Sequence, residues 1–188
     1  MLAGLCEAVD ARPYMRGHGA RVGELAEAVA LRLGWGGERI RRLRIGALLH
    51  DLGKLAVADE IWSKPGRLSE GELAEIRRHP AAGMRLLSRL PDFRFAIPSV
   101  LFHHERWDGR GYPFGCRAGA IPLEARVLAL ADAFDAMTSP RPYCPLLSTP
   151  EAFAEIARCA GSQFDPAIAQ VFIGLGTLQT ARPLAADG

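Results

Sequence analysis

Apolar residues recur at helical spacing along most of the chain, and this pattern restricts the fold more than any other feature of the sequence. The clearest example is the segment 18–34, in which one helix face would carry Val22, Leu25, Ala26, Val29 and Leu33. The segment stops at GWGG (34–37), and glycine readily takes the left-handed conformation that ends a helix. These residues predict an amphipathic helix with a defined end.

Further segments carry helical periodicity or the signals of a helix start, namely residues 38–55, 69–79, 93–106, 122–138, 149–160 and 165–175. Ser69 and Glu72 stand in capping-box positions, and we expect Pro80 to bend or end that helix just after His79. Pro150 suits the first turn of a later helix. No alternating strand pattern of convincing length competes. We therefore predict an all-α, single-domain bundle of about seven helices.

Composition supports one domain and excludes several partners. The chain has 188 residues, 49% of them hydrophobic, which is enough for one sizeable core. We predict a single domain over residues 1–175 and a flexible C-terminal tail over 176–188, which is rich in small residues. The net charge of +2, without a long run of one sign, argues against a DNA or RNA partner but leaves room for a local basic pocket.

Neither a membrane span nor a signal peptide is indicated. Charged residues interrupt the apolar runs well before the roughly 18 residues that a transmembrane helix needs. The N-terminus, MLAGLCEAVDARPYMRG, lacks a basic region followed by an apolar one. The four cysteines have no CxxC spacing, so we expect them to be reduced in a cytoplasmic protein.

Histidines and two acids recur along the chain about one helix–turn–helix unit apart, at roughly 12 residues per helix. Positions so spaced return to the same level of a bundle. The set consists of His18, His50, Asp51, His79, His103, His104 and Asp132. A histidine taken alone is more often a hydrogen-bonded core or surface residue. Brought together, neutral imidazoles and carboxylates form a ligand set for divalent iron, manganese, zinc or similar ions.

Two adjacent pairs, His50–Asp51 and His103–His104, suggest more than one metal ion. Consecutive side chains on a helix diverge by about 100°, so both can serve one centre only from different sides or through two ions. A carboxylate such as Asp51 can bridge two cations roughly 3.5 to 4 Å apart, the separation used in two-metal hydrolysis of phosphate esters.

Four stretches now stand out in order: HDLGK (50–54), HP (79–80), HHERWDGRGYP (103–113) and ALADAFDAMTSPRPY (129–143). They resemble the motifs of the HD-GYP family of phosphodiesterases, a branch of the HD-domain metallophosphohydrolases, over about residues 14–172. The resemblance implies an HD-domain-like all-α fold and hydrolysis of cyclic di-GMP, or in some members of mixed cyclic GMP-AMP, at two or three iron or manganese ions.

Matched to the family motifs, the seven residues above correspond to metal ligands, with Asp51 as the bridge. Lys54 matches a lysine that steadies the attacked phosphate, so the expected catalytic residues are Asp51 and Lys54. A glycine-flexed lip, GRGYP (109–113), would present Arg110, Gly111 and Tyr112 to the substrate, and Arg141 is a further expected contact. Asp135 shares the face of Asp132 and is placed to hold the second nitrogen of a ligand histidine.

We expect in-line attack on phosphorus by a hydroxide that bridges two metal ions, because metal binding lowers the pKa of water towards neutrality. The resemblance implies linear pGpG as product, with variable further cleavage to GMP. Alternatives are a phosphodiesterase for cyclic GMP-AMP or another nucleotide, and a catalytically silent module that binds a diguanylate cyclase or another partner. A homodimer and a sensor or receiver partner are both compatible with the sequence.

Two positions depart from the family pattern. Tyr14 stands where some three-metal members have a glutamate, and a neutral phenol is a poor ligand, so we predict two metal ions, iron or manganese. Cys144 stands where RPY is commonly followed by a basic residue. We therefore expect weaker substrate binding than in a typical member, and a lower KM in Cys144→Arg.

Overall fold

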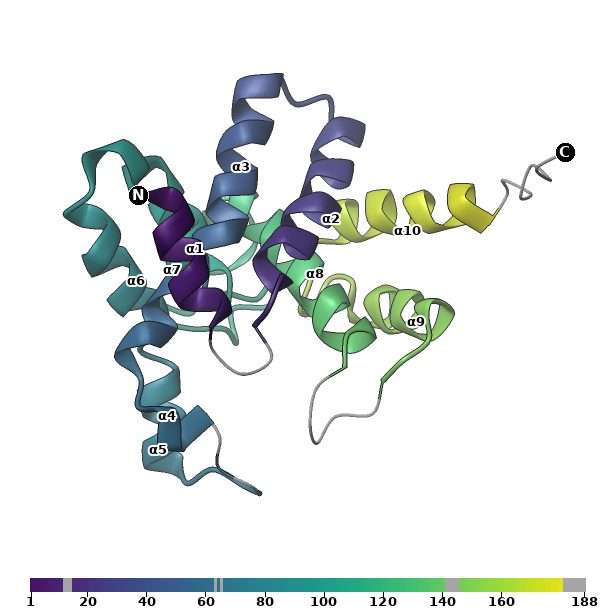
Figure 1. Ribbon diagram of the computed structural model, residues 1–188. Helices are drawn as coiled ribbons and strands as arrows, with labels where there is room; N and C mark the ends of the chain where they lie inside the picture. The colour runs from purple at the N-terminus through teal and green to yellow at the C-terminus, as the bar shows by residue number, and fades with distance from the viewer. Residues whose placement is uncertain (12–14, 63, 65, 141–145, 181–188) are drawn as a thin grey trace, which may run out of the picture.

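The structure is a computed structural model that describes residues 1–11, 15–62, 64, 66–140 and 146–180. The regular secondary structure among these residues consists of helices joined by turns and loops, and no strand occurs among them (Figure 1). The all-α prediction is confirmed. Among the helices thus described, none is long and apolar enough to cross a membrane.

The longer helices form the body of the molecule, and shorter segments connect them (Figure 1). The α-helices are α1 (Leu2–Asp10), α2 (His18–Arg32), α3 (Gly37–Leu49), α4 (Asp59–Trp62), α5 (Glu70–Ile76), α6 (His79–Ser88), α7 (Ile97–Phe102), α8 (Leu123–Thr138), α9 (Thr149–Cys159) and α10 (Pro166–Thr180). Within the part of the chain that the structure describes, three 3-10 helices join them: η1 (Leu52–Ala56), η2 (Pro91–Ala96) and η3 (Ala118–Ala120).

Most of the predicted helices are present, and the differences lie at their ends. The segment 38–55 divides into α3 and η1, because the chain leaves the helix at His50 and Asp51. The segment 93–106 likewise divides into η2 and α7. Helix α1 was not among the predicted segments, although Leu2, Leu5 and Val9 stand at helical spacing, and α10 continues beyond residue 175 to Thr180. Residues 181–188 of the predicted tail lie outside the described residues.

Pro80 plays a different role from the one predicted. Ser69 does cap α5 in a capping box with Glu72, but α5 ends at Ile76. His79 and Pro80 instead open α6, where proline is favoured because the first turn needs no backbone N–H donor at that position. The prediction that Pro80 bends or ends the preceding helix just after His79 is therefore wrong, because that helix has already ended at Ile76.

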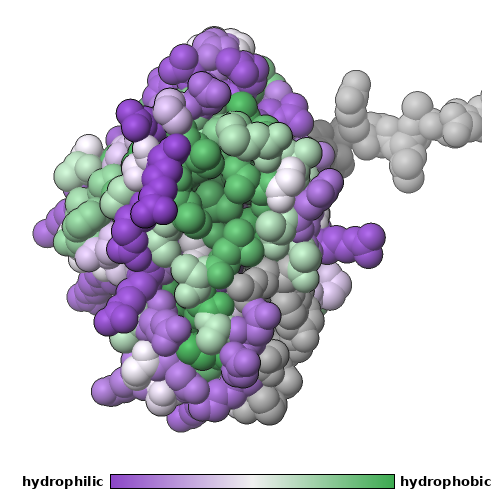
Figure 2. All heavy atoms as spheres, turned by 60° about the vertical axis from the view of Figure 1, so that its left-hand side comes forward, coloured by the Kyte–Doolittle hydropathy of each residue, from purple (hydrophilic) through white to green (hydrophobic). Residues whose placement is uncertain are grey.

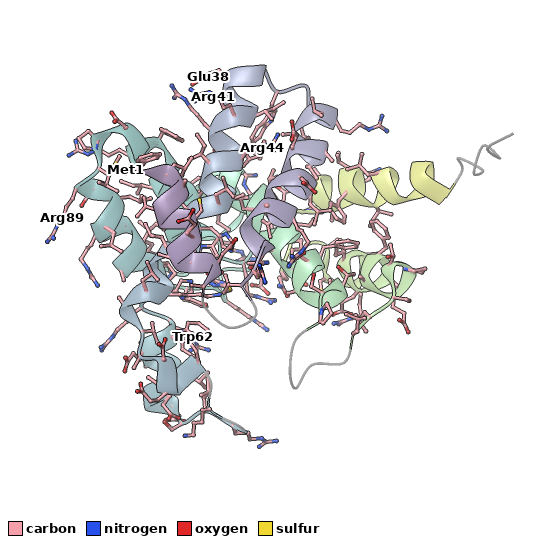
Figure 3. All side chains as sticks on the ribbon, in the orientation of Figure 1. Met1, Glu38, Arg41, Arg44, Trp62 and Arg89 are labelled. Atoms are coloured by element: carbon pink, nitrogen blue, oxygen red, sulfur yellow. The ribbon has the colours of Figure 1, made fainter. Side chains whose placement is uncertain are left out.

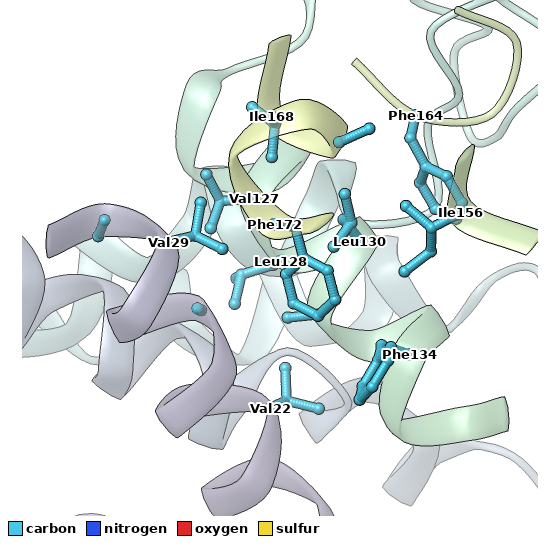
Figure 4. Close-up of a cluster of buried hydrophobic side chains, with 14 of the residues drawn as sticks. Val22, Val29, Val127, Leu128, Leu130, Phe134, Ile156, Phe164, Ile168 and Phe172 are labelled. Atoms are coloured by element: carbon cyan, nitrogen blue, oxygen red, sulfur yellow. The ribbon is translucent and has the colours of Figure 1, made fainter. Parts of the chain in front are cut away.

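The main hydrophobic core lies where α2 and α8 meet α9 and α10 (Figure 4). Val22 and Val29 of α2 face Leu128 of α8 and Phe172 of α10, and all four side chains are buried. Such burial stabilises by about 25 cal/mol per Å² of apolar surface removed from water. A second core cluster beneath α1, η1 and α6 includes Val9, Leu52 and Leu87. The two cores hold the helix ends that carry the histidines.

A close approach of backbones brings the HD segment against α6. A Cβ atom on Gly53 in η1 would collide with the carbonyl oxygen of His79 and the backbone nitrogen of Gly83. Only glycine therefore allows η1 to lie directly on the first turn of α6. This contact places Asp51 next to His79.

The surface contains hydrophilic and hydrophobic areas. Figure 2 shows a broad hydrophobic band on one face, bordered by hydrophilic side chains. Charged residues gather at the outer end of α3, where Glu38 accepts hydrogen bonds from Arg41 at 2.9 Å (Figure 3). Exposed ion pairs of this kind contribute little to stability, typically about 0 to 1 kcal/mol.

Candidate metal centre

All five histidines of the chain converge on one place. Their ring centroids form a continuous series, with separations of 5.2 Å for His18–His50, 5.0 Å for His50–His103 and 5.3 Å for His79–His103. The centroids of His103 and His104 lie 4.0 Å apart. The bundle thus brings together histidines that lie far apart in the sequence, from His18 to His104, as their spacing predicted.

Helix ends orient three of these rings in the same way. His50 and His103 are the C-cap residues of α3 and α7, and His79 stands just beyond the end of α5. The Nδ1 atom of each ring bonds to the backbone carbonyl three residues earlier. The distances are 2.6 Å from His50 to Ala47, 2.7 Å from His79 to Ile76 and 2.9 Å from His103 to Val100. The last carbonyls of a helix lack intrahelical donors, and the imidazoles supply them.

These carbonyl contacts determine the tautomer of each ring. A carbonyl oxygen only accepts, so Nδ1 must carry the proton, and the Nε2 atom of the neutral ring keeps a free lone pair. The Nε2 atoms of His79 and His103 lie 3.3 Å apart. Two lone pairs facing one another at that distance repel unless a cation lies close by, and a cation bound by both would remove the conflict.

Asp51 lies at the centre of the cluster, and its two oxygens face different histidines. Oδ2 lies 3.2 Å from Nε2 of His50 and 3.7 Å from Nε2 of His18. Oδ1 lies 3.5 Å from Nε2 of His79 and 3.8 Å from Nε2 of His103. One buried carboxylate is therefore shared by two sets of imidazole nitrogens.

The donor set fits divalent cations. His50 Nε2 and Asp51 Oδ1 are buried and form no hydrogen bond among the described residues, although buried polar atoms are nearly always satisfied. The potential ligand atoms form two groups, and within each group all atoms lie within 4.8 Å of one another. One group comprises Asp51, His79, His103 and His104, and the other comprises His18, His50 and Asp51. Imidazole nitrogen with carboxylate oxygen suits iron, manganese or zinc. The cluster is thus able to bind metal, with Asp51 common to both groups.

His18 is oriented by two carboxylates of α8. Its Nδ1 bonds to Oδ2 of Asp135 at 2.7 Å, and its Nε2 lies 3.2 Å from Oδ1 of Asp132. Asp135 also accepts a hydrogen bond from Arg21 at 2.6 Å. The predicted contact of Asp135 with the second nitrogen of a histidine is confirmed.

Electrostatics favour the protonation states that a metal site needs. Burial lowers the pKa of His79 and His104 to about 4 and also lowers that of His103, so these imidazoles are neutral at pH 7. Burial raises the pKa of Asp51, but the interaction with His50 and the charge of Lys54 outweigh it, hold the pKa well below its usual range and keep this carboxylate ionised.

His18 behaves differently from the other rings in the metal-free chain. Burial lowers its pKa, but hydrogen bonds to Asp132 and Asp135 raise it to about 9. Those acids therefore hold a proton on the ring, and metal binding through Nε2 would release it.

Lys54 reaches the same cluster. Its Nζ lies 2.7 Å from Oδ2 of Asp51 and 5.0 Å from the ring centroid of Trp62. The ammonium group therefore lies beside the predicted bridging carboxylate, close enough to meet a substrate that approaches Asp51.

The lip folds back onto the histidine segment. Phe114 donates its backbone N–H to Oε1 of buried Glu105 at 2.7 Å, and Tyr112 donates its own to the carbonyl of His104 at 3.2 Å. A Cβ atom on Gly111 would collide with the backbone of residues 104–106, so glycine is required there. The Tyr112 ring consequently stacks on His104, with centroids 4.7 Å apart and an interplanar angle of 24°.

A pocket of about 490 Å³ opens beside this stack. His103, His104 and Asp132 contribute to its wall, as do Arg110, Gly111 and Tyr112. Its volume falls within the range of about 300 to 1,000 Å³ that is typical of ligand sites. The predicted lip residues and part of the predicted ligand set thus face one cavity.

Some predictions concern residues whose structure is not described. Tyr14, Arg141 and Cys144 lie outside the described residues, so the two-metal count and the consequences of Cys144 stay predictions. The sequence reasoning missed Arg77, which also lines the pocket. Its position two residues before the HP pair was the available signal, but an arginine at a helix end usually interacts with solvent.

A family model described as an HD domain matches residues 6–168. The chain belongs to the HD-domain family. The resemblance inferred from its motifs is confirmed. This HD-domain chain is 43% identical over 148 residues to the cyclic di-GMP phosphodiesterase response regulator RpfG of Xanthomonas campestris pv. campestris, covering 78% of the chain and 39% of that protein.

A second relative is named for a different substrate. The HD-domain chain is 36% identical over 159 residues to 3′3′-cGAMP-specific phosphodiesterase 3 of Vibrio cholerae, covering 84% of the chain and 35% of that protein. The chain therefore spans less than half the length of both relatives. A solved structure of a cyclic GMP-AMP-specific phosphodiesterase of V. cholerae matches with a TM-score of 0.70 and 19% identity, over 94% of this chain and 47% of that one. The HD-domain fold is thereby established.

Proposed function

We propose that this HD-domain chain is a metal-dependent phosphodiesterase that hydrolyses cyclic di-GMP to linear pGpG. The observation that carries the proposal is the buried carboxylate of Asp51, whose two oxygens face separate pairs of imidazoles. Phosphate-ester hydrolysis uses such a shared ligand set. The 43% identical relative, named a cyclic di-GMP phosphodiesterase, supports the choice of substrate.

Two divalent cations, iron or manganese, are the proposed cofactors. The proposed ligands of one are His18, His50, Asp51 and Asp132, and those of the other are Asp51, His79, His103 and His104. When bound, the cations would supply Lewis-acid activation of water and of the phosphate. Once His18 has released its proton, each ligand is a neutral imidazole or a carboxylate, which is the form that these cations prefer.

The hydrolysis forms one bond and breaks another. The oxygen of water bonds to phosphorus, the bond from phosphorus to the 3′ oxygen breaks, and the 3′ oxygen takes up a proton. Opening one phosphodiester of cyclic di-GMP in this way leaves a 5′ phosphate and a 3′ hydroxyl, which is linear pGpG. Cleavage of the second phosphodiester would yield GMP.

The chain's own side chains bind and orient the substrate. Lys54, beside Asp51, is proposed to stabilise the charge that develops on the attacked phosphate. Burial raises the pKa of Tyr112, so its phenol stays protonated, and it can donate a hydrogen bond or stack on a base. Arg110 is proposed to meet a phosphate from the lip, and Arg141 remains a proposed contact.

Mixed cyclic GMP-AMP is a second candidate substrate, because a 36% identical relative is named 3′3′-cGAMP-specific. The pocket wall includes Tyr112, and a hydrogen bond from its phenol does not depend on which purine the ligand carries. Direct measurement of products separates the two candidates.

The decisive experiment is a product analysis on anaerobically purified protein. Metal content is measured first, and the protein is then incubated with cyclic di-GMP, 3′3′-cGAMP and cyclic di-AMP, with products identified by mass spectrometry. We expect about two metal ions per chain and formation of pGpG. Fully metal-loaded, folded protein that cleaves none of the three would refute the proposal and favour a silent binding module.

A further inference from the structure

Arg77 forms the outer layer of a column of side chains that ends at the histidine cluster. It is the C-cap residue of α5 and lines the 490 Å³ pocket. Its guanidinium carbon lies 5.7 Å from the ring centroid of Tyr112, and Tyr112 stacks on His104 at 4.7 Å. A guanidinium on this column faces the same space that a ligand of the histidine cluster would enter.

The guanidinium of Arg77 is also available for a ligand. Several other arginines around the site are neutralised, since Arg21 pairs with Asp135 at 2.6 Å and Arg106 pairs with Asp108 at 2.8 Å. Arg77, by contrast, forms no hydrogen bond or ion pair with any side chain among the described residues, and it is exposed. An unpaired guanidinium in a pocket attracts anions, and its planar fork of donors matches a phosphate.

We propose that Arg77 binds a phosphate of the cyclic dinucleotide. The inference rests on the proposed function, and it adds a substrate contact that the sequence motifs did not include. A cyclic dinucleotide has two phosphates, and hydrolysis to the linear product attacks only one of them. The pocket must therefore also accommodate a second negative charge. Arg77 supplies a positive charge away from the side-chain atoms that are predicted to bind metal.

A structural role for Arg77 would have a different consequence. Its stem could merely cover the Tyr112 ring, and that packing would survive replacement by methionine, which has an unbranched apolar chain of similar reach. Phosphate binding would not survive, because methionine carries no charge and no donor. Arg77→Met therefore separates the two roles.

Arg78 provides a matched control. It is the next residue, it is exposed, and it does not contribute to the pocket wall. The experiment compares wild type, Arg77→Met and Arg78→Met in metal-loaded protein. It measures KM and kcat for cyclic di-GMP and 3′3′-cGAMP at low and high salt, and binding of both by calorimetry.

We expect KM to rise about tenfold in Arg77→Met with a smaller change in kcat, because a contact to a phosphate that does not react exists in both ground and transition states. Arg78→Met should match wild type. The difference between the variants should shrink as salt rises, since screening weakens exposed charge interactions.

Each remaining outcome has a defined meaning. Equal KM values for the two variants in an active enzyme would overturn the role of Arg77 and leave the proposed function intact. A wild type that binds a cyclic dinucleotide through Arg77 without cleaving it would refute the proposed function and retain the inference. A wild type that neither binds nor cleaves would refute both.

Discussion

Asp135 bonds to the nitrogen of His18 that points away from the histidine cluster. Its Oδ2 lies 2.7 Å from Nδ1 of the imidazole, so Nε2 is the atom that faces Asp51 and Asp132. A carboxylate that bonds the second nitrogen of a metal-binding histidine fixes the ring and raises its basicity. Asp135 is itself held by Arg21. Burial raises the pKa of this carboxyl, but the hydrogen bonds with His18 and Arg21 outweigh it and lower the pKa to about 2. This relationship extends the candidate site one layer beyond the atoms that would contact a metal.

Replacement of Asp135 by asparagine should weaken metal binding by about 10 to 100-fold, because the ring loses its charged partner. The dissociation constant is measured by titrating manganese into metal-stripped protein. Asp92→Asn, at an exposed position in η2, is the control. An unchanged affinity in Asp135→Asn would show that this hydrogen bond does not influence the site.

Replacement of Asp51 by alanine should abolish turnover and reduce the bound metal, because both proposed ion positions lose a shared ligand. The helices should persist, since Asp51 lies outside the two apolar cores that stabilise the bundle. Metal analysis, circular dichroism and product formation test these points together. Near-native turnover of any cyclic dinucleotide in this variant would contradict the proposed site.

Replacement of Gly53 by alanine should destabilise the protein by about 1 to 3 kcal/mol, because the added methyl group forces η1 away from α6. Gly71→Ala in α5 is the matched control, since a Cβ atom there meets nothing within 4 Å. The control should stabilise the protein by about 0.5 to 1 kcal/mol through helix propensity. Denaturant unfolding measures both, and equal shifts would contradict the close contact of the two backbones.

The metal-free protein should be most stable near pH 6.5, the ordinary pKa of histidine. Below that pH the unfolded chain binds more protons than the folded chain, because burial lowers the pKa of His79 and His104 in the folded chain to about 4. Stability should therefore fall as pH falls from about 6.5 to about 4, by on the order of 3 kcal/mol for each ring.

His18 produces the alkaline side of the same curve. Burial opposes its charge, but hydrogen bonds to Asp132 and Asp135 raise its pKa to about 9, so the stability that its charged form contributes is lost as pH rises from about 6.5 to about 9. Thermal unfolding of metal-stripped protein across this range measures both limbs. His104→Asn should make the acid limb less steep, because only the contribution of His79 then remains of the two, and it should leave the alkaline limb unchanged. A curve without a maximum would contradict both pKa shifts.

The sequence alone predicted the all-α class, most helices and the convergence of His18, His50, His79, His103 and His104. Helical periodicity is local, because it requires only that apolar residues repeat along one face. Motif spacing extends this to the level of the bundle, since connected helices of similar length return the chain to the same end. The boundary at His79 and Pro80 was misjudged, because proline suits the start of one helix as well as the end of another.

Tertiary structure alone decided how those residues face one another. The carbonyls of Ala47, Ile76 and Val100 select the proton position of three imidazoles, and no spacing rule specifies which nitrogen then faces Asp51. The contact of Gly53 with α6 and the position of Arg77 beside Tyr112 join segments whose relative placement depends on the packing of the whole bundle. Periodicity determines which face of a helix is buried, whereas distances between atoms on different helices depend on how all the side chains between them pack.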